Sequence, residues 1–414
     1  MTEKTKRILL AVGFVVVTLL MAFLLYWIIF RPTLGPVVVE NVNELPPGVL
    51  PETNVNGGPT VVNINGQEVI IPQAELPVIS TVALGDKTLS TELTDSAVTN
   101  MDLSADGSTM RYYDPASGTF SRVNADGTIT AISATVFKDV DSVAWSPVKD
   151  EAILEFPDGS NIYYNFQTGK QVTLPKEYEE FSYSGTGSSI AFKYMHIDEE
   201  RRVLAVANPD GSGARTLEAL GDNANKVDVN FSPDGTVAAT FREFIDAHRQ
   251  EVGFIGLNNE NFKGMVVEGS GFEGAWDPDG TQMVYSVYST DSRLKPTLWV
   301  VDAKGNDIGK NRIDLGVNTW ADKCAFSSNG GSVYCGVPKD LPNGAGIVPD
   351  LAQRTTDDIY QINLSTGQKT KVAIPVDING VESTSVEKMS ISEDGSTLYY
   401  VDAITGRLNK INLK

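Results

Sequence analysis

Few residues of this chain could do chemistry. Its 414 residues include only two histidines, His196 and His248, and two cysteines, Cys324 and Cys335. A Ser-His-Asp triad needs a histidine held by an acid and facing a nucleophile, and the sequence has no Gly-x-Ser-x-Gly elbow. Zinc needs His or Cys ligands at short spacing, which this sequence does not offer. We therefore expect no catalytic, metal or cofactor site and no enzyme, and we interpret both histidines as loop residues.

The aspartate-rich turns are the remaining candidates for metal chemistry. Residues 277–280 read Asp-Pro-Asp-Gly, which on its own would suggest calcium. Calcium loops, however, place their ligands at regular spacing and end on a bidentate glutamate, and both features are missing here. We interpret these segments as structural turns.

The two cysteines bracket a predicted hairpin with its turn at residues 328–331. A symmetric turn places Phe326 opposite Val333 and Cys324 opposite Cys335. Opposed residues of antiparallel strands have Cα atoms about 4.5–5.5 Å apart, which a disulfide can bridge. The sequence therefore predicts a Cys324–Cys335 disulfide. Two buried thiols, or a bulge that shifts the register, are the alternatives.

One turn recurs along the chain and must position everything else. Residues 231–236 read Phe-Ser-Pro-Asp-Gly-Thr, and residues 276–281 read Trp-Asp-Pro-Asp-Gly-Thr. Proline pre-sets the turn, aspartate bonds its own backbone, and glycine takes the positive φ. An Asp-Gly turn followed by alternating apolar residues predicts a hairpin. Weaker copies lie at residues 103–108, 145–147, 183–188, 326–331 and 391–396.

The spacing of these turns predicts the architecture. The apolar residues that enter them are Leu103, Trp145, Tyr183, Phe231, Trp276, Phe326 and Ile391, which lie 38 to 65 residues apart. Repeats of about 40–45 residues with four strands each are typical of propeller blades. A single blade cannot bury both its faces, so the repeats must stack around an axis. We predict an all-β fold with a seven-bladed β-propeller, with six or eight blades as alternatives.

The repeated turn, entered from an aromatic residue and followed by a short apolar strand, resembles the TolB-like and WD-repeat-like propeller families. The resemblance covers residues 98–414 and implies a fold rather than a function. The chain departs from the TolB pattern in two ways: no α/β domain precedes the repeats, and seven repeats are present where that family has six.

The pattern of the N-terminal segment predicts a membrane anchor. Residues 1–7 carry Lys4, Lys6 and Arg7, and residues 8–30 contain no charged side chain. This uncharged segment is long enough to form one transmembrane helix. A cleaved signal peptide is the alternative, but its apolar region is shorter and is followed by small residues. The positive-inside rule places residues 1–7 in the cytoplasm and the remainder outside it, in the periplasm or at the cell surface.

The part of the chain after the anchor has the composition of a spacer and an acidic domain. Residues 31–76 are rich in Pro, Asn and Gly, and the Val-rich pieces within 61–71 could form a hairpin or dock on the propeller. Beyond residue 31 the chain holds 29 basic and 52 acidic residues, so it repels nucleic acid. The propeller is expected over residues 77–414. Its last blade lacks a fourth strand, and we predict that residues 77–84 supply it.

Long connections point to a binding face. The connections within the first and last hairpin of each repeat are short, whereas those between the second and third strands vary, and that at residues 338–356 is the longest. All of these variable connections emerge on one face of a propeller, where binding sites are commonly built. The large side chains among them are the candidate protein contacts, and packing among the loops is the alternative: Arg242, Phe244, Tyr288, Arg293, Leu341 and Ile347.

The sequence thus predicts a membrane-anchored, extracytoplasmic propeller that acts as a protein-binding or scaffolding module of the cell envelope. Binding of a glycan or small ligand in the central channel is the main alternative. A propeller enzyme is the third, disfavoured by the scarcity of histidine and of metal ligands.

Overall fold

The computed structural model describes Met21 and residues 60–64, 67–71, 79–124 and 126–414. They divide into two units, with the boundary between Ala74 and Glu75. In the first unit β1 (Thr60–Ile64) pairs antiparallel with β2 (Gln67–Ile71), which confirms a hairpin in this segment.

No helix within the described ranges is long and apolar enough to span a membrane. The predicted span at residues 8–30 lies outside the described residues except for Met21, as do residues 1–7 and most of the spacer. The membrane anchor therefore stays a prediction.

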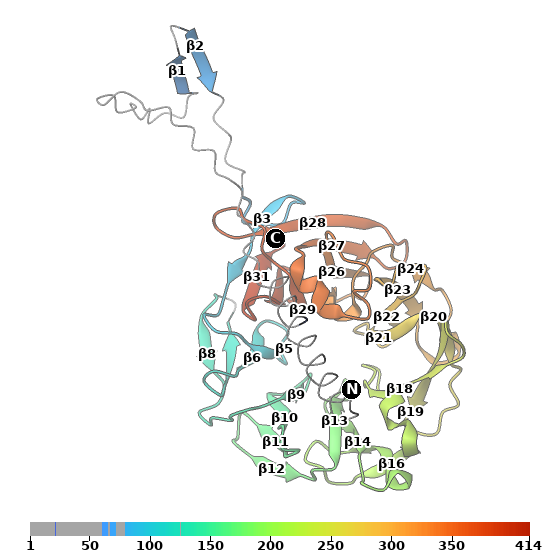
Figure 1. The fold of residues 1–414 in the computed structure, drawn as a ribbon. Coiled ribbons are helices and arrows are strands. Elements are labelled where there is room, and N and C mark those ends of the chain that lie inside the picture. The colour runs from blue at the N-terminus through green and yellow to red at the C-terminus, as the bar shows by residue number, and fades with distance from the viewer. Residues whose placement is uncertain (1–20, 22–59, 65–66, 72–78, 125) are drawn as a thin grey trace, which may run out of the picture. The chain divides into compact units, whose positions relative to one another are not determined.

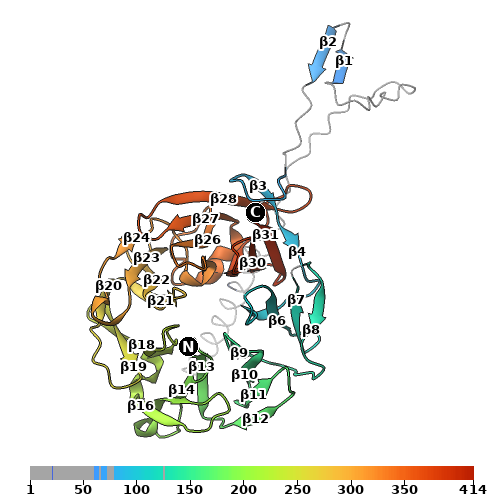
Figure 2. The same ribbon diagram turned by 180° about the vertical axis from the view of Figure 1, so that it is seen from behind.

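In the second unit seven β-sheets surround a central axis (Figures 1 and 2). This confirms the seven-bladed all-β propeller. Numbered along the chain, each blade begins with its innermost strand. The blades consist of β5 (Thr99–Leu103), β6 (Met110–Asp114), β7 (Thr119–Val123) and β8 (Ile129–Ala131); β9 (Ser142–Trp145), β10 (Glu151–Glu155), β11 (Asn161–Asn165) and β12 (Gln171–Leu174); β13 (Tyr178–Tyr183), β14 (Ile190–Tyr194), β15 (Val203–Ala207) and β16 (Arg215–Ala219); β17 (Val227–Val229), β18 (Val237–Phe244), β19 (Arg249–Gly256) and β20 (Met265–Glu268); β21 (Ser270–Trp276), β22 (Gln282–Tyr288), β23 (Pro296–Asp302) and β24 (Ile313–Asp314); β25 (Cys324–Phe326), β26 (Ser332–Pro338), β27 (Asp357–Asn363), β28 (Lys369–Val376) and β3 (Lys87–Leu89); and β29 (Val386–Ile391), β30 (Thr397–Asp402), β31 (Leu408–Asn412) and β4 (Thr91–Glu92).

Short 3₁₀ helices occupy some of the connections. They are η1 (Glu199–Arg201), η2 (Gly221–Lys226), η3 (Gly305–Asp307), η4 (Ala321–Lys323) and η5 (Pro349–Arg354).

The core lies between the blades, because each sheet must bury both faces. Blades 1 and 2 meet through an aromatic cluster that includes Tyr113, Phe120, Trp145 and Phe166. Each of the other six pairs of neighbouring blades shares a cluster of its own, and the pair formed by blades 7 and 1 closes the ring.

The repeated turn also connects neighbouring blades. Asp234 Oδ1 accepts hydrogen bonds from Ser232 Oγ at 2.7 Å and from the backbone N–H of Thr236 at 3.1 Å, which fixes the turn of blade 4. Gly280, in the turn of blade 5, has φ +65°, and a Cβ there would lie 2.8 Å from Asp234 N. Glycine is therefore required both for the positive φ and for the close approach of the two turns.

The ring closes differently from the sequence prediction. The fourth strand of blade 7 is β4, which pairs antiparallel with β31, and not residues 77–84. β3 adds to blade 6 as a fifth strand, parallel to β28. Residues 77 and 78 lie outside the described part, and Ala83 contributes one hydrogen bond, from its N–H to Asn412 O at 2.8 Å. The strands that close the ring are therefore residues 87–92, which lie further along the chain than the predicted residues 77–84.

The alternation of antiparallel strands gives the propeller two distinct faces. On the turn face lie the connections between the first and second and between the third and fourth strands. On the opposite face, named here the loop-rich face, lie the connections between the second and third strands and the links between blades. The turn face is less uniform than predicted, because the connections between β19 and β20 and between β23 and β24 span residues 257–264 and 303–312.

Candidate functional site

The longest connection, residues 339–356 between β26 and β27, is folded onto the loop-rich face. Leu341, Ala345 and Ala352 are buried in a small cluster against Trp320, with Leu351 packed beside them. These apolar residues give the connection its own core. It is therefore a structured part of the surface, as its apolar composition allows.

The same connection is held by the loop of the neighbouring blade. Gly344 N donates to Arg293 O at 3.0 Å, and Gly346 N donates to Leu294 O at 2.8 Å. Arg293 and Leu294 have φ of +57° and +58°, a conformation that non-glycine residues seldom adopt. A Cβ at Gly346 would lie 2.5 Å from Tyr288 Cβ, so the two connections are in direct contact.

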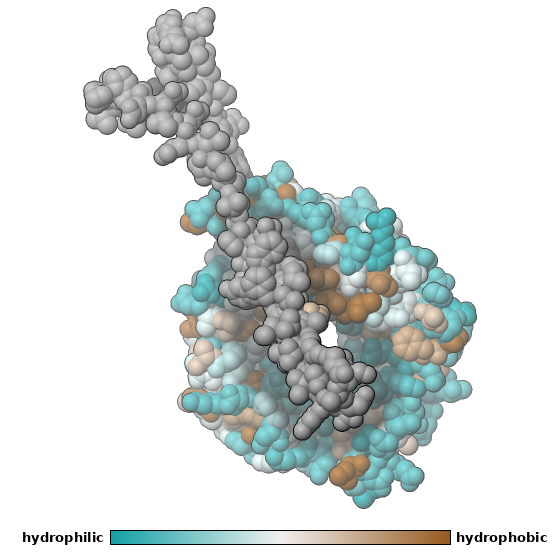
Figure 3. All heavy atoms as spheres, in the orientation of Figure 1, coloured by the Kyte–Doolittle hydropathy of each residue, from teal (hydrophilic) through white to brown (hydrophobic). Residues whose placement is uncertain are grey.

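The folded connection presents an apolar tip. Ile347 and Val348 are 56% and 47% exposed, although the residues on either side of them are fixed by hydrogen bonds and packing. Figure 3 shows hydrophobic atoms gathered beside the central opening, over the segment drawn in orange between β26 and β27 in Figure 1. An apolar tip on a fixed support is a common form of protein-binding surface.

The six residues proposed from the sequence differ in what they can contact. Phe244, Arg293 and Ile347 are exposed on the loop-rich face. Arg242 is partly covered, because its Nη2 donates to Asp228 Oδ1 at 2.9 Å and its Nη1 to Phe272 O at 3.1 Å. Tyr288 packs against Gly346, and Leu341 is buried in the support of the long connection. The packing alternative therefore holds for Leu341, which no partner can reach in this structure.

Other exposed apolar residues on this face were missed from the sequence. Among residues 79–414, thirteen large hydrophobic side chains are exposed, and nine of them lie in connections or strand ends on the loop-rich face. Their position between second and third strands, or between blades, was the available signal. The nine are Val136, Ile197, Phe244, Ile245, Ile347, Val348, Ile378, Val381 and Ile404. Phe244 and Ile347 were proposed from the sequence, and the other seven were not.

The mouth of the channel on this face is acidic. Glu273, Asp322 and Glu387, together with Asp350 of the long connection, line a hollow of about 260 Å³. Burial, together with the nearby charge of Asp322, raises the pKa of Glu273 to about 7. The pKa of Asp322 and that of Glu387 are raised mainly by the same burial. All three side chains are surrounded by protein yet keep an exposed part, so a basic group that reached them would favour their ionised form.

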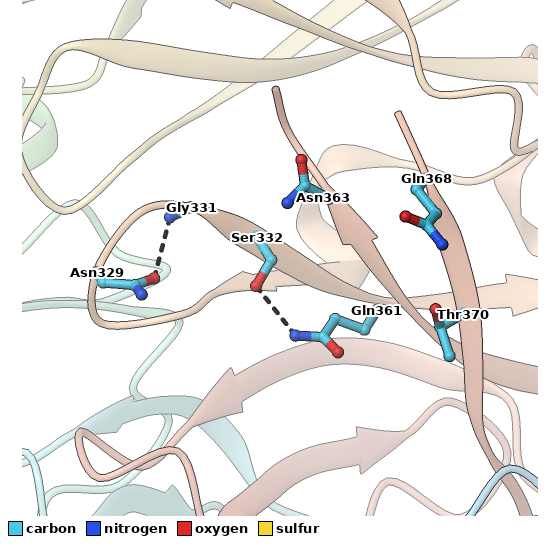
Figure 4. Close-up of a pocket in the computed structure, with 7 residues that line it drawn as sticks. All are labelled: Asn329, Gly331, Ser332, Gln361, Asn363, Gln368 and Thr370. Carbon is cyan, nitrogen blue, oxygen red and sulfur yellow. Dashed lines mark hydrogen bonds between the residues drawn. The ribbon is translucent and has the colours of Figure 1, made fainter. Parts of the chain in front are cut away.

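The turn face has hollows of its own. One of about 490 Å³ is lined by aromatic residues and prolines of blades 2 to 5, among them Trp145, Phe181 and Pro233. Another, of about 310 Å³, lies on blade 6 (Figure 4). There Gly331 N donates to Asn329 Oδ1 at 3.1 Å, and Gln361 Nε2 donates to Ser332 Oγ at 3.2 Å. Because these bonds close the turn and join adjacent strands, we assign the hollow on blade 6 to turn structure.

The cysteines and histidines lie where the sequence analysis placed them. In the register of β25 and β26, Cys324 is opposite Cys335 and Phe326 is opposite Val333, and the two sulfur atoms are bonded in this structure. His196 and His248 are loop residues. Across the described ranges, no group of three His, Cys, Asp or Glu side chains is arranged to hold a metal ion.

Comparisons with known proteins support the fold and go no further. No family model matches the chain, and no curated protein matches it. Among solved structures, the β-propeller domain of Cps50 (Swd1) from Myceliophteria thermophila is similar with a TM-score of 0.52 and 13% identity, over 79% of this chain and 100% of that one. An oligogalacturonate lyase in complex with manganese has a TM-score of 0.49 and 11% identity, over 78% and 93%. Hydrazine synthase of Kuenenia stuttgartiensis has 0.49 and 14%, over 77% and 96%. At these identities the chain is shown to be a β-propeller resembling WD-repeat domains, and the TolB-like resemblance stays a prediction.

Proposed function

We propose that this protein is a membrane-anchored, extracytoplasmic propeller whose loop-rich face binds another protein. One observation carries the proposal: nine of the thirteen large hydrophobic side chains exposed by residues 79–414 lie on that face. Random placement would not favour one face, and exposed apolar patches on rigid scaffolds are typical of interaction sites. Ile347 and Val348 form the best supported part of the surface, because their connection has its own core.

The charge of the channel mouth indicates what kind of partner fits. Glu273, Asp322 and Glu387 lie at the same face as the apolar tip. A partner that combines an apolar contact with a lysine or arginine would pair with these carboxylates and relieve their mutual repulsion. We therefore expect a partner surface that is basic around an apolar centre.

The N-terminal sequence supports the location of the module. Residues 8–30 are uncharged and follow three basic residues, which favours an anchor with the propeller outside the cytoplasm. The full-length protein should stay in the membrane fraction during alkaline carbonate extraction, whereas a protein without residues 1–31 should be released. Continued membrane retention without this segment would contradict the anchor.

A ligand in the central channel is the second candidate. The aromatic and proline-lined hollow of about 490 Å³ on the turn face has a size typical of small-molecule sites. In this case the protein would act as a receptor for a small apolar or glycan ligand. Both proposals describe a binding protein, and we propose no catalytic activity for either.

Site-specific photo-crosslinking tests the proposed protein-binding face. A photoreactive amino acid at Val348 of the full chain, expressed in its host membrane, should capture a specific protein that mass spectrometry identifies. The matched control places it at Ile129, which is 46% exposed on the outer strand β8. Substituting Ile347→Asp should abolish the capture. Capture at Ile129 but not at Val348, or capture that Ile347→Asp leaves intact, would contradict the proposed face.

A further inference from the structure

Blade 4 differs from the other six blades in the outer edge of its third strand. In blade 2 the outer strand pairs along β11, and Asn165 N donates to Lys170 O at the turn. In blade 5, where β24 is short, irregular chain completes the edge through bonds such as Leu315 N to Leu298 O and Asp302 N to Lys310 O. The remaining blades complete this edge in similar ways.

In blade 4 the pairing stops halfway. β19 runs from Arg249 to Gly256, but β20 pairs only with residues 249–252. The chain then turns back on itself: Glu260 accepts hydrogen bonds from Asn258, through its N–H at 2.6 Å and its Nδ2 at 2.9 Å. This local turn keeps residues 257–264 from extending along β19.

The alternating direction of the backbone groups along β19 shows which N–H and C=O groups have no partner. His248 O accepts from Gly269 N on the outer side, so every second residue after His248 presents its backbone N–H and C=O to that edge. Residues 250 and 252 meet β20, whereas Phe254 and Gly256 find no backbone or side-chain partner within the described ranges. An open strand edge is a template for pairing with another chain.

A hollow of about 400 Å³ lies along this open edge. It is bordered by Leu217 and Glu218 of β16, by Phe241 of β18, and by Glu260 and Phe262 of the following connection. The aromatic and aliphatic side chains form an apolar floor, and the open strand forms one wall. An extended peptide would find both backbone partners and a place for every second side chain.

The charge around the hollow indicates a basic occupant. The bordering segments, residues 215–223 and 249–268, contain five acidic and three basic residues. Two of the three basic side chains already have partners within the protein. Arg215 Nη1 donates to Leu257 O at 3.0 Å, and Arg249 forms an ion pair with Asp246 at 2.7 Å. Glu218 and Glu260 form no ion pair within the described ranges. Charge complementarity therefore favours lysine or arginine in the occupant.

We propose that an extended, basic segment of a partner protein adds to β19 as a new strand beside Phe254 and Gly256. This is recognition by strand addition, in which main-chain bonds supply affinity and pockets for alternate side chains supply specificity. The site lies between blades 3 and 4 and uses none of the residues proposed for the loop-rich face, so the two proposals stand or fall separately.

Synthetic peptides test the proposal on the full 414-residue chain. The probe is a fluorescein-labelled hexapeptide of alternating lysine and valine, followed by fluorescence anisotropy and by hydrogen–deuterium exchange. Two derivatives carry N-methyl groups, one on all lysine amides and one on all valine amides. Only one set of amides faces β19, so only one derivative loses hydrogen bonds to the strand. Each lost bond should weaken binding roughly two- to tenfold, so this derivative should bind at least about tenfold more weakly than the unmethylated peptide. The other derivative serves as the matched control.

Exchange and charge give independent readouts. Peptide binding should slow amide exchange in residues 253–256, and a glutamate–valine peptide should not bind. Glu218→Lys, a surface change, should weaken binding of the basic peptide severalfold. Equal binding of both methylated derivatives, protection confined to the loop-rich face, or absence of binding would overturn the proposal. Protection of residues 253–256 that rises with protein concentration alone would assign the edge to a second copy of this chain instead.

Discussion

Replacing Arg111 with alanine should loosen the contact between blades 1 and 2. The Arg111 side chain is fully buried, and its Nη2 donates to Ser146 O at 2.6 Å and lies 3.1 Å from Asp102 Oδ2. Its Nη1 donates to Lys149 O at 3.1 Å, and the guanidinium lies 4.5 Å from the centre of the Trp145 ring. One side chain of blade 1 thus satisfies two backbone carbonyls in the first turn of blade 2.

The expected loss follows from these contacts. The Ser146 carbonyl left without a partner costs about 1–3 kcal/mol, whereas Lys149 O keeps the bond from Glu151 N at 2.9 Å. The contact with the Trp145 ring adds about 1–2 kcal/mol. Asp102 is 44% exposed and can be solvated again, so the loss of its ion pair contributes little. We therefore expect a total loss of about 2–5 kcal/mol. For the unit Glu75–Lys414, an unfolding entropy of about 2.1 cal/mol/K per residue converts this loss to a fall in Tm of about 3–7 °C.

Scanning calorimetry of the full chain measures this effect. The matched control is Arg122→Ala, because Arg122 lies directly opposite Arg111 in the register and is only half-buried. Its pairing with Asp150 at 2.8 Å is worth at most about 1 kcal/mol. Arg111→Lys keeps the charge without the forked geometry and should fall between the two. If Arg111→Ala and Arg122→Ala lower the Tm equally, the buried contacts do not hold these blades together.

Three further predictions concern closure, the disulfide and pH. Deleting residues 87–92 removes both closing strands, so thermal unfolding should begin at a lower temperature than in Arg111→Ala; an unchanged Tm would contradict this mode of closure. Intact-mass measurement with alkylation should find Cys324 and Cys335 protected until a reductant is added, whereas two thiols alkylated without reductant would exclude the bond. The pKa of Glu273 is raised to about 7 by burial and by Asp322, so the native state binds its proton more tightly than the unfolded state. Stability should therefore fall between about pH 4.5 and pH 7, and Glu273→Gln should stabilise the protein at pH 8 but not at pH 4, as thermal melts at both pH values would show.

Local chemistry explains why the blades could be predicted from the sequence. Six of the seven predicted turn entries, including Trp145 and Trp276, are the last residues of innermost strands. Phe231 lies two residues beyond the end of β17. The turn residues and the alternation act over a few residues, and the spacing of the turns can be counted along the chain. All three can therefore be recognised without knowledge of the tertiary structure. The register of the cysteine hairpin follows from the same short-range geometry.

Ring closure could not be predicted in the same way. Residues 77–84 have the apolar, β-branched composition of a strand, whereas β4 consists of Thr91 and Glu92, both exposed. A closing strand needs only backbone groups opposite β31, so composition does not mark it. The position of β4 is set by how far the chain can reach from blade 6, where β3 is paired, to the start of β5.

The connection at residues 339–356 shows the same limit at the candidate site. Leu341 and Ile347 were both proposed as candidate contacts, because sequence cannot tell a residue that supports a surface from one that forms it. Leu341 packs on Trp320, which belongs to the link between blades 5 and 6, while Ile347 is exposed. That division depends on contacts between segments about 20 residues apart in sequence, and these exist only after the ring has formed.

Both proposed binding surfaces arise where the repeat is broken. A regular blade completes its own hydrogen bonds and buries its side chains against its neighbours, which leaves little for a partner to recognise. The long connection of blade 6 adds exposed apolar surface to an already satisfied ring, and the turn at Glu260 in blade 4 leaves part of β19 unpaired. The first deviation offers side chains and the second offers backbone, so a partner at the loop-rich face should be sensitive to side-chain substitution there. A partner at β19 should instead be sensitive to methylation of its own backbone.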